Sequence, residues 1–151
     1  TGLVVIGLLS CSHPNEKRNL FPLALEEFNT ALVWKNYNVA SSYLAFPDSR
    51  GEIARLRRRS DKIRVVEVEP LESRVAADGD SATAVVRFSW YGEADLTVHQ
   101  GVEVQTWKKV NGEWLMDGRK PGSDKSQDPS PFLPEESGEP PPEGDSALDA
   151  S

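Results

Sequence analysis

The hydrophobic pattern of this chain changes after Asp61 from a helical repeat to alternation, and this change restricts the fold more than any other feature. Alternating apolar and polar residues predict four strands, at residues 63–76, 81–91, 96–110 and 113–117. The turns between them are short, and Asn111-Gly112 is a typical two-residue hairpin turn. The strands are therefore expected to form a mostly antiparallel sheet.

Two residues predict curvature in this sheet. Pro70 should bend the first strand, because proline has no N–H to donate to a neighbouring strand. Gly101 should bend or bulge the third strand. The face expected to point inward from the second strand carries Ala82, Ala84, Val86, Phe88 and Trp90.

Helices are expected before the strands. Residues 22–44 repeat apolar side chains at helical spacing, with a break predicted near Asn36-Tyr37-Asn38, and residues 49–59 should form a second helix. Helices that precede a strand meander predict an α+β fold. We expect N-terminal helices packed on a curved, mostly antiparallel four-stranded sheet, a cystatin-like cone.

The net charge of −7 is unevenly distributed. Residues 12–120 carry 16 basic and 16 acidic side chains, whereas residues 121–151 carry one basic and eight acidic side chains. Residues 119–151 are therefore expected to be a disordered, acidic, Pro-rich tail. Within it, Pro129 to Pro134 is either a short anchor for a partner or part of a solvated appendage. An acidic tail on a neutral domain argues against nucleic-acid binding.

The start of the chain carries its single cysteine, Cys11, so no internal disulfide can form. The stretch Leu8-Leu9-Ser10-Cys11 ends an apolar run and resembles the lipobox of bacterial lipoproteins. No Lys or Arg precedes Lys17, so residues 1–11 are expected to be a truncated lipoprotein signal. An ordinary signal segment that happens to contain a cysteine is the alternative.

The lipobox resemblance implies a signal peptide that is cleaved before Cys11, and acyl chains such as palmitate attached at Cys11. Residues 12–21 would then form a tether to the membrane. Ser12 follows the cysteine, which is similar to the pattern that sorts lipoproteins to the outer membrane. The expected location is the bacterial cell envelope, on the outer membrane and facing the periplasm.

A second resemblance concerns residues 22–118. The stretches Phe28 to Tyr37, Tyr43 to Pro47 and Trp107 to Trp114 are similar to the opening helices and last hairpin of nuclear-transport-factor-like (NTF2-like) and SnoaL-like proteins. The resemblance implies a cone whose sheet and helices enclose a cavity. Members include ketosteroid-isomerase-like enzymes, ligand carriers and interaction modules, and they often form homodimers through the exposed sheet face. Within the family, the chain resembles uncharacterised lipoprotein members.

No catalytic constellation is evident, and no cofactor or metal site is expected. An isomerase-like cone would need a carboxylate base, here Asp95 or Glu93, and a hydrogen-bond donor, here Tyr91 or His99. These residues crowd one turn and are expected at a hairpin tip in water. The tryptophans are expected either in the core or lining a pocket: Trp34, Trp90, Trp107 and Trp114.

Three functions are compatible with these features of the sequence. The leading hypothesis is a lipid-anchored, non-enzymatic envelope protein that serves as an interaction or assembly module for another envelope protein. The alternative is a cone that holds a small apolar ligand in the periplasm. A ketosteroid-isomerase-like enzyme is third.

Overall fold

The computed structural model describes residues 20–45, 49–123 and 128–133. The helices are α2 (Phe21–Val33), α3 (Tyr37–Ser41) and α4 (Ser49–Ser60). The strands are β1 (Ile63–Val75), β2 (Ser81–Gly92), β3 (His99–Val110), β4 (Glu113–Pro121) and β5 (Asp128–Pro129). The expected signal segment with Cys11 lies outside the described residues.

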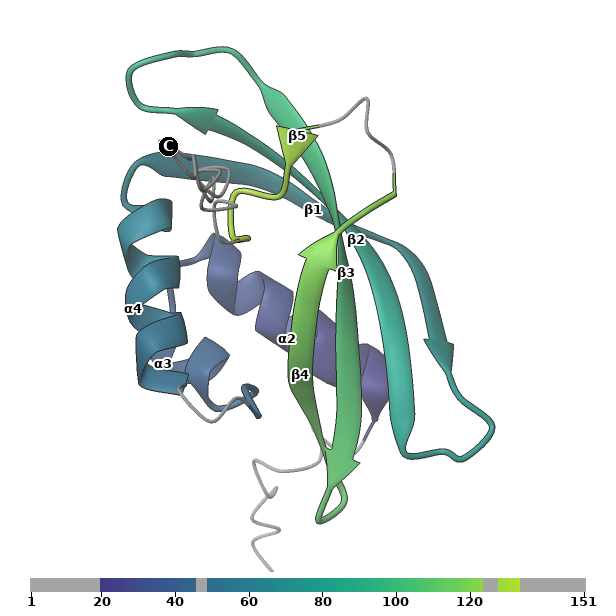
Figure 1. The fold of residues 1–151 in the computed structure, drawn as a ribbon. Coiled ribbons are helices and arrows are strands. Elements are labelled where there is room, and N and C mark those ends of the chain that lie inside the picture. The colour runs from purple at the N-terminus through teal and green to yellow at the C-terminus, as the bar shows by residue number, and fades with distance from the viewer. Residues whose placement is uncertain (1–19, 46–48, 124–127, 134–151) are drawn as a thin grey trace, which may run out of the picture.

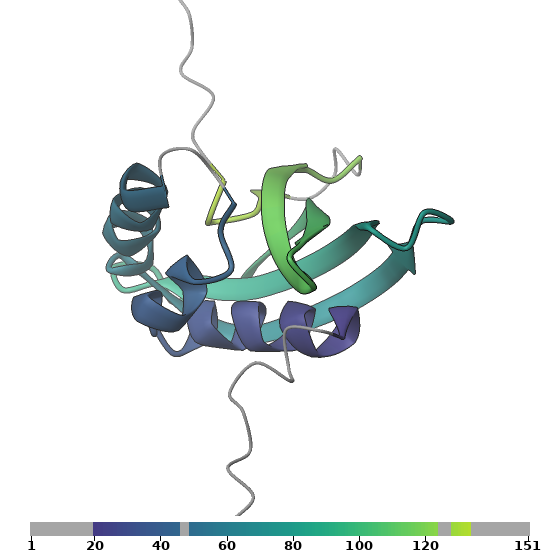
Figure 2. The same ribbon diagram turned by 90° about the horizontal axis from the view of Figure 1, so that it is seen from below.

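The strands form one sheet in the order β1-β2-β3-β4, and every neighbouring pair is antiparallel. The short β5 runs parallel to β3. Figure 1 shows the helices gathered on one side of this curved sheet, and Figure 2 shows the sheet arching over α2. The predicted α+β architecture, with N-terminal helices packed on a four-stranded antiparallel sheet, is confirmed.

β1 is an edge strand with two irregularities. Its pairing with β2 shifts register between Val65 and Glu67, and again between Pro70 and Glu72. The second shift lies at the predicted bend, where proline cannot donate a hydrogen bond to its neighbour. Each shift increases the local twist of β1 and so contributes to the curvature of the sheet.

β3 does not contain the bulge that the sequence predicts at Gly101. The register of β2 and β3 runs through Gly101 without a shift, so the bulge, one of the two expected irregularities, is absent there. Gly101 is instead the residue where β3 pairs with Asp128 of β5, beyond the end of β4. A glycine inside a strand also permits close approach by another backbone, and here the approaching backbone is β5.

A tight break separates α2 from α3, close to the position that the polar run predicts. Lys35 adopts a positive φ of 55°, and the Asn36 N–H donates to the Ala31 carbonyl at 2.7 Å. The Asn36 side chain then accepts from the Val39 N–H and caps α3. The break leaves Trp34 at the carboxyl end of α2 with 78% of its surface exposed.

Trp107 on β3 lies at the centre of the hydrophobic core and is 1% exposed. Its ring centroid lies 5.8 Å from Phe21, 5.7 Å from Phe28 and 6.3 Å from Tyr43, all edge-on. These contacts join α2 and the segment after α3 to the sheet. The predicted inward face of β2 is confirmed, because all five of its residues are buried: Ala82, Ala84, Val86, Phe88 and Trp90.

The folded domain extends beyond the expected boundary at residue 118. β4 continues through Pro121, and the chain returns at Asp128 as β5, followed by a short turn. Phe132 is 0% and Leu133 is 3% exposed. The expectation of a disordered tail therefore does not hold for residues 119–123 and 128–133, because these apolar side chains pack into the domain. Residues 134–151 lie outside the described part of the chain.

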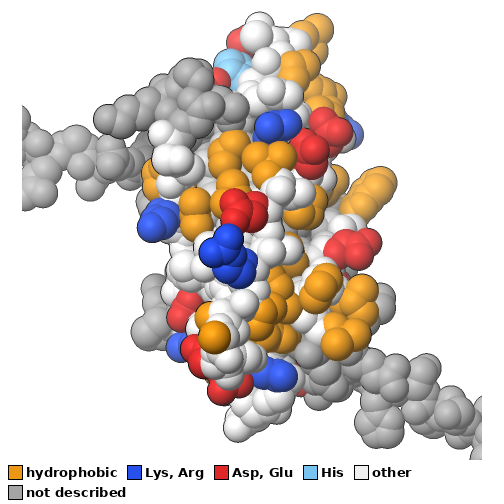
Figure 3. Space-filling model, turned by 90° about the vertical axis from the view of Figure 1, so that its right-hand side faces the viewer, with side chains coloured by type: hydrophobic (Ala, Val, Ile, Leu, Met, Phe, Trp, Pro, Cys, Tyr) orange, Lys and Arg blue, Asp and Glu red, His pale blue; other side chains and the backbone are white. Residues whose placement is uncertain are grey.

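The outer face of the sheet is mixed in character. Figure 3 shows the side of the molecule away from α4, where hydrophobic side chains gather among charged ones. The β2–β3 register places Val85 beside Val104 on this face, and Arg87 pairs with Glu69 at 2.9 Å. Within the described residues, no helix combines the length and apolar composition that crossing a bilayer requires.

The position of Trp107 yields a prediction about stability. Trp107→Ala should lower the free energy of unfolding by about 3–5 kcal/mol, since it leaves a cavity between α2 and the sheet. Trp34→Ala is the matched control and should change stability by less than about 0.5 kcal/mol, because Trp34 is exposed. Urea denaturation followed by circular dichroism measures both values, and equal losses would contradict this assignment of the core.

Candidate functional site

The interior of the cone contains a polar cluster on β3. Side chains alternate along the strand, so Glu103 and Gln105 share the inner face with Trp107. Glu103 and Gln105 are both 0% exposed. A fully buried carboxylate is uncommon unless hydrogen bonds and a cation compensate for the loss of water.

Gln105 connects this cluster to α2. Its Nε2 donates to Glu103 Oε1 at 2.7 Å and to Asn29 Oδ1 at 2.8 Å. Asn29 is 2% exposed, and its Nδ2 donates to the Leu25 carbonyl at 2.8 Å. The chain of bonds fixes the position of α2 on the sheet and satisfies the buried amides.

Arg119 on β4 supplies the cation, and its side chain is 3% exposed. The Arg119 Nε lies 4.0 Å from Glu103 Oε1. The Arg119 Nη2 lies 3.9 Å from Glu52 Oε1 on α4. Its Nε and Nη1 are buried without a hydrogen-bond partner among the described residues. The guanidinium therefore has donor capacity that its two carboxylates do not use.

The C-terminal strap, which we define as residues Asp128 to Leu133, covers this cluster. Its Ser130 hydroxyl donates to Glu103 Oε2 at 2.7 Å, and its Phe132 carbonyl accepts a hydrogen bond from Arg119 Nη2. The Phe132 ring lies edge-on to Phe88, with 5.1 Å between centroids. The strap thus places one hydroxyl, one carbonyl and one aromatic ring against the interior.

The position of Glu52 depends on the packing of α4 against α3. Tyr37 hydrogen-bonds to Ser60 at the end of α4, and the Arg57 guanidinium lies 5.2 Å from the centre of the Tyr37 ring. Burial raises the pKa of the Tyr37 hydroxyl, the negative charge of Asp61 raises it further, and Arg57 opposes both effects. Tyr37 therefore remains a neutral hydrogen-bonding group between the two helices.

A separate hollow lies on the surface between α2 and β1, with a volume of about 190 Å³. Exposed Trp34 and Val66 lie beside it, 78% and 54% exposed. Val66 is the residue at the first register shift of β1. The hollow is lined by Glu26, Asn29, Thr30, Val33, Trp34, Val66, Glu67, Val68 and Pro70.

The four tryptophans occupy two environments. Trp90, Trp107 and Trp114 are 8%, 1% and 3% exposed and belong to the core. Trp34 lines the surface hollow. The sequence leaves either environment open for all four, although helical spacing places Trp34 off the face that Phe28 and Leu32 share.

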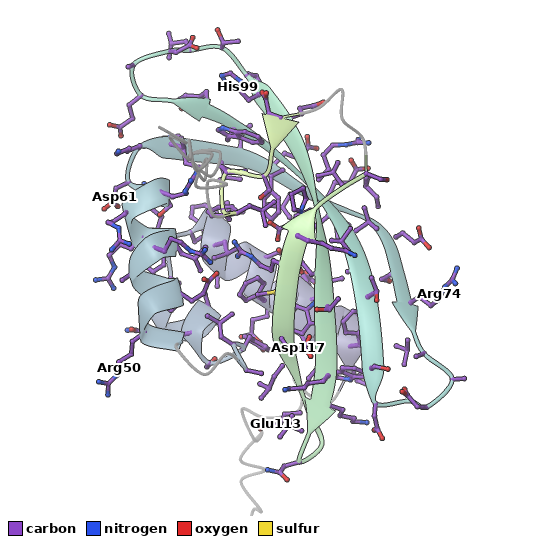
Figure 4. The ribbon with its side chains drawn as sticks, in the orientation of Figure 1. Arg50, Asp61, Arg74, His99, Glu113 and Asp117 are labelled. Atoms are coloured by element: carbon purple, nitrogen blue, oxygen red, sulfur yellow. The ribbon has the colours of Figure 1, made fainter. Side chains whose placement is uncertain are left out.

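The residues considered for acid–base chemistry lie around the β2–β3 turn, away from the buried cluster. Figure 4 shows His99 at the start of β3, beside β5. Its Nδ1 lies 2.9 Å from Asp128 Oδ2, and its Nε2 lies 3.7 Å from Asp95 Oδ2. Glu93 and Asp95 are exposed and Tyr91 is half-buried. Hydrogen bonds from the Thr97 side chain and N–H, with a smaller effect of His99, lower the pKa of Asp95.

The residues of the buried cluster were not identified from the sequence. The alternation of β3 gave no signal for them, because Val102 and Val104 lie on its outer face, whereas Glu103 and Gln105 are buried on its inner face. Nothing in the sequence indicates that Arg119 and Ser130 meet them. Among residues 20–45, 49–123 and 128–133, no three His, Cys, Asp or Glu side chains lie together as metal ligands would.

The buried charges yield a second prediction. Arg119→Met should destabilise the protein by about 3–5 kcal/mol, because the Glu103 carboxylate loses its cation but stays buried. The double variant Arg119→Met/Glu103→Gln should recover part of this loss. Arg74→Met, at a side chain that is 79% exposed, is the control. Guanidinium denaturation measures all three, and a loss for Arg119→Met no larger than for Arg74→Met would refute the coupling.

Similarity to known proteins is confined to the level of structure. No protein-family model matches the chain. No curated protein matches it either. Solved structures do match, and the three described below are less than 25% identical to this chain, so they bear on the fold alone.

A SEC-C motif containing protein from Rhodopseudomonas palustris matches with a TM-score of 0.61 and 11% identity, over 70% of this chain and 81% of that chain. A protein of unknown function with a cystatin-like fold from Nostoc punctiforme matches with a TM-score of 0.52 and 16% identity, over 73% of this chain and 90% of that chain. An NTF2-like protein from Cytophaga hutchinsonii matches with a TM-score of 0.51 and 18% identity, over 68% of this chain and 94% of that chain. The chain has the cone fold of NTF2-like and cystatin-like proteins.

Proposed function

We propose that this protein is a lipid-anchored, non-enzymatic lipoprotein of the bacterial envelope that serves as a protein-interaction or assembly module. The lipobox-like stretch that ends at Cys11 supports the anchor. The exposure of Trp34 beside the surface hollow is the observation that carries the interaction role.

Trp34 has the properties of an interface residue. Tryptophan is enriched among the residues that dominate binding energy, and such residues lie beside pockets that a partner fills. Trp34, Val33 and Val66 form an apolar surface on the hollow, and Glu26 and Glu67 lie among its lining residues. A partner that inserts an apolar side chain and carries basic residues nearby would complement this surface.

The interior of the cone offers less support for the alternative of a small apolar ligand. Phe88, Trp107 and Phe132 are 0%, 1% and 0% exposed and fill the space between sheet and helices. Acid–base catalysis also receives little support, although the Glu103 carboxylate is fully buried in the interior. Both oxygens of Glu103 already accept hydrogen bonds, from Gln105 and Ser130.

A homodimer is the second assembly that we propose for this module. The outer sheet face around Val85 and Val104 would form its interface. This face lies on the sheet, whereas the Trp34 hollow lies between α2 and β1, so the two surfaces could be occupied independently.

The anchor is tested in cells that express the protein with its natural leader. Wild-type protein should sediment with envelopes, and its N-terminal peptide should carry the mass of attached acyl chains. Cys11→Ser should release it to the soluble fraction, because several buried acyl chains are needed for stable attachment. Ser12→Ala retains the cysteine and is the control. Equal sedimentation of Cys11→Ser and Ser12→Ala would exclude the anchor.

The interaction surface is tested by cross-linking in intact cells followed by mass spectrometry. Trp34→Ala should reduce the recovery of the main cross-linked partner by about tenfold or more, as expected for a residue that dominates an interface. Leu96→Ala is the matched control, because Leu96 is 82% exposed and does not line the hollow. Finding no partner above background, or equal recovery from both variants, would overturn the proposal.

A further inference from the structure

The C-terminal strap lies against the interior of the cone as a bound peptide lies in its groove. We propose that the space between β3, β4 and α4 is a peptide-binding groove and that the strap is its built-in occupant. An extended segment of a partner protein can replace the strap if it carries a hydroxyl residue followed, two positions later, by Phe and then Leu. This inference concerns a surface other than the Trp34 hollow and does not depend on the proposed function.

The hydroxyl position is recognised by a buried carboxylate. Ser130 is 2% exposed, and its Oγ donates to Glu103 Oε2 at 2.7 Å. A hydrogen bond to an ionised acceptor in a buried site is stronger than a neutral one. Replacing the hydroxyl by a methyl group would leave one oxygen of Glu103 without its donor, so the groove discriminates against Ala at this position.

The backbone of the occupant is recognised by Arg119. Its Nη2 donates to the Phe132 carbonyl, while its Nε and Nη1 remain buried without hydrogen-bond partners among the described residues. Buried donors without acceptors are costly. The groove therefore offers more donor groups than the strap uses, and an occupant with a further carbonyl or carboxylate would bind more tightly.

The aromatic position is recognised by Phe88 on β2. Phe132 lies edge-on to it with 5.1 Å between ring centroids, and both side chains are 0% exposed. Leu133 is 3% exposed beside them. Aromatic anchors in well-packed pockets commonly dominate the affinity of peptide complexes, so Phe132 is expected to contribute most to docking.

The edge of β3 positions the occupant. β4 ends opposite Glu103, and β5 then pairs with Gly101 and Val102 on the same edge. Gly122 permits this change of partner, because a Cβ there would lie 2.7 Å from Val102 Cγ1. Adding an extended segment to a free strand edge is a common mode of peptide recognition. Only two residues of the strap pair in this way. Few backbone hydrogen bonds must therefore break when a partner's segment replaces the strap.

The short connection to β4 keeps the strap docked in the isolated protein. A tether of a few residues gives its end an effective concentration on the order of 1 mM. A competing peptide with the same contacts must therefore approach that concentration to replace the strap. Weakening the strap alone should remove this competition and expose the intrinsic affinity of the groove.

The test uses the full chain and a fluorescein-labelled peptide with the sequence of residues 127–136. Phe132→Ala in the protein should bind this peptide at least about tenfold more tightly than wild type, measured by fluorescence anisotropy. Leu96→Ala should bind it as weakly as wild type. A peptide with its own Phe replaced by Ala should bind no variant. Equal binding by folded Phe132→Ala and wild type would overturn the proposal.

A second measurement applies if Phe132→Ala does not fold. Hydrogen exchange of the wild-type protein should show the Phe132 and Leu133 amides exchanging at least about 100-fold faster than amides in the centre of β2, because the strap opens locally. The peptide added at millimolar concentration should not slow exchange in β2. If the strap amides exchange their hydrogens only through global unfolding, the strap is a fixed part of the core. That result would refute its replacement by a peptide.

Discussion

The alternation of side chains along β3 determines what the interior of this domain contains. Gln105 and Trp107 share one face, so the residue that centres the aromatic core lies next to a polar pair that begins at Glu103. Asn29 on α2 joins that pair through Gln105 at 2.8 Å. The same helix therefore makes apolar contacts with Trp107 and hydrogen bonds with Gln105, two residues earlier on β3. These two sets of contacts fix the position of α2 along the sheet.

Burial of Glu103 imposes a further requirement on the chain. A carboxylate removed from water needs donors on both oxygens and a nearby cation. Gln105, Ser130 and Arg119 supply these groups from three separate segments. The C-terminal strap thus supplies a hydrogen-bond donor to the buried carboxylate and apolar side chains that shield it from water. For this reason the folded domain does not end with β4.

Much of the architecture could be predicted from the sequence, because it depends on local patterns. Alternation over residues 81–91 identified the inward face of β2, and the polar residues around Asn36 marked the break between α2 and α3. Gly101 was misinterpreted because a strand glycine has two meanings, a bulge or a close backbone approach. Local pattern cannot distinguish them without knowledge of what approaches.

The buried cluster could not be predicted for a related reason. Glu103, Arg119 and Ser130 are brought together by three-dimensional packing between segments whose individual patterns look ordinary. The Pro-rich composition around Ser130 is typical of disordered chains, and a single pair of apolar residues, Phe132 and Leu133, is too weak a compositional signal to predict docking. Composition describes an average over a segment, whereas two buried side chains are enough to order part of it.

The irregular edge strand β1 has a consequence for contacts between copies of this domain. A long flat edge exposes backbone groups to pairing with neighbouring copies and can seed amyloid-like growth. β1 is 13 residues long, but its two register shifts distort the edge, and exposed charges such as Arg64 and Glu72 flank them. The distorted and charged edge of β1 therefore disfavours strand pairing between copies of this domain.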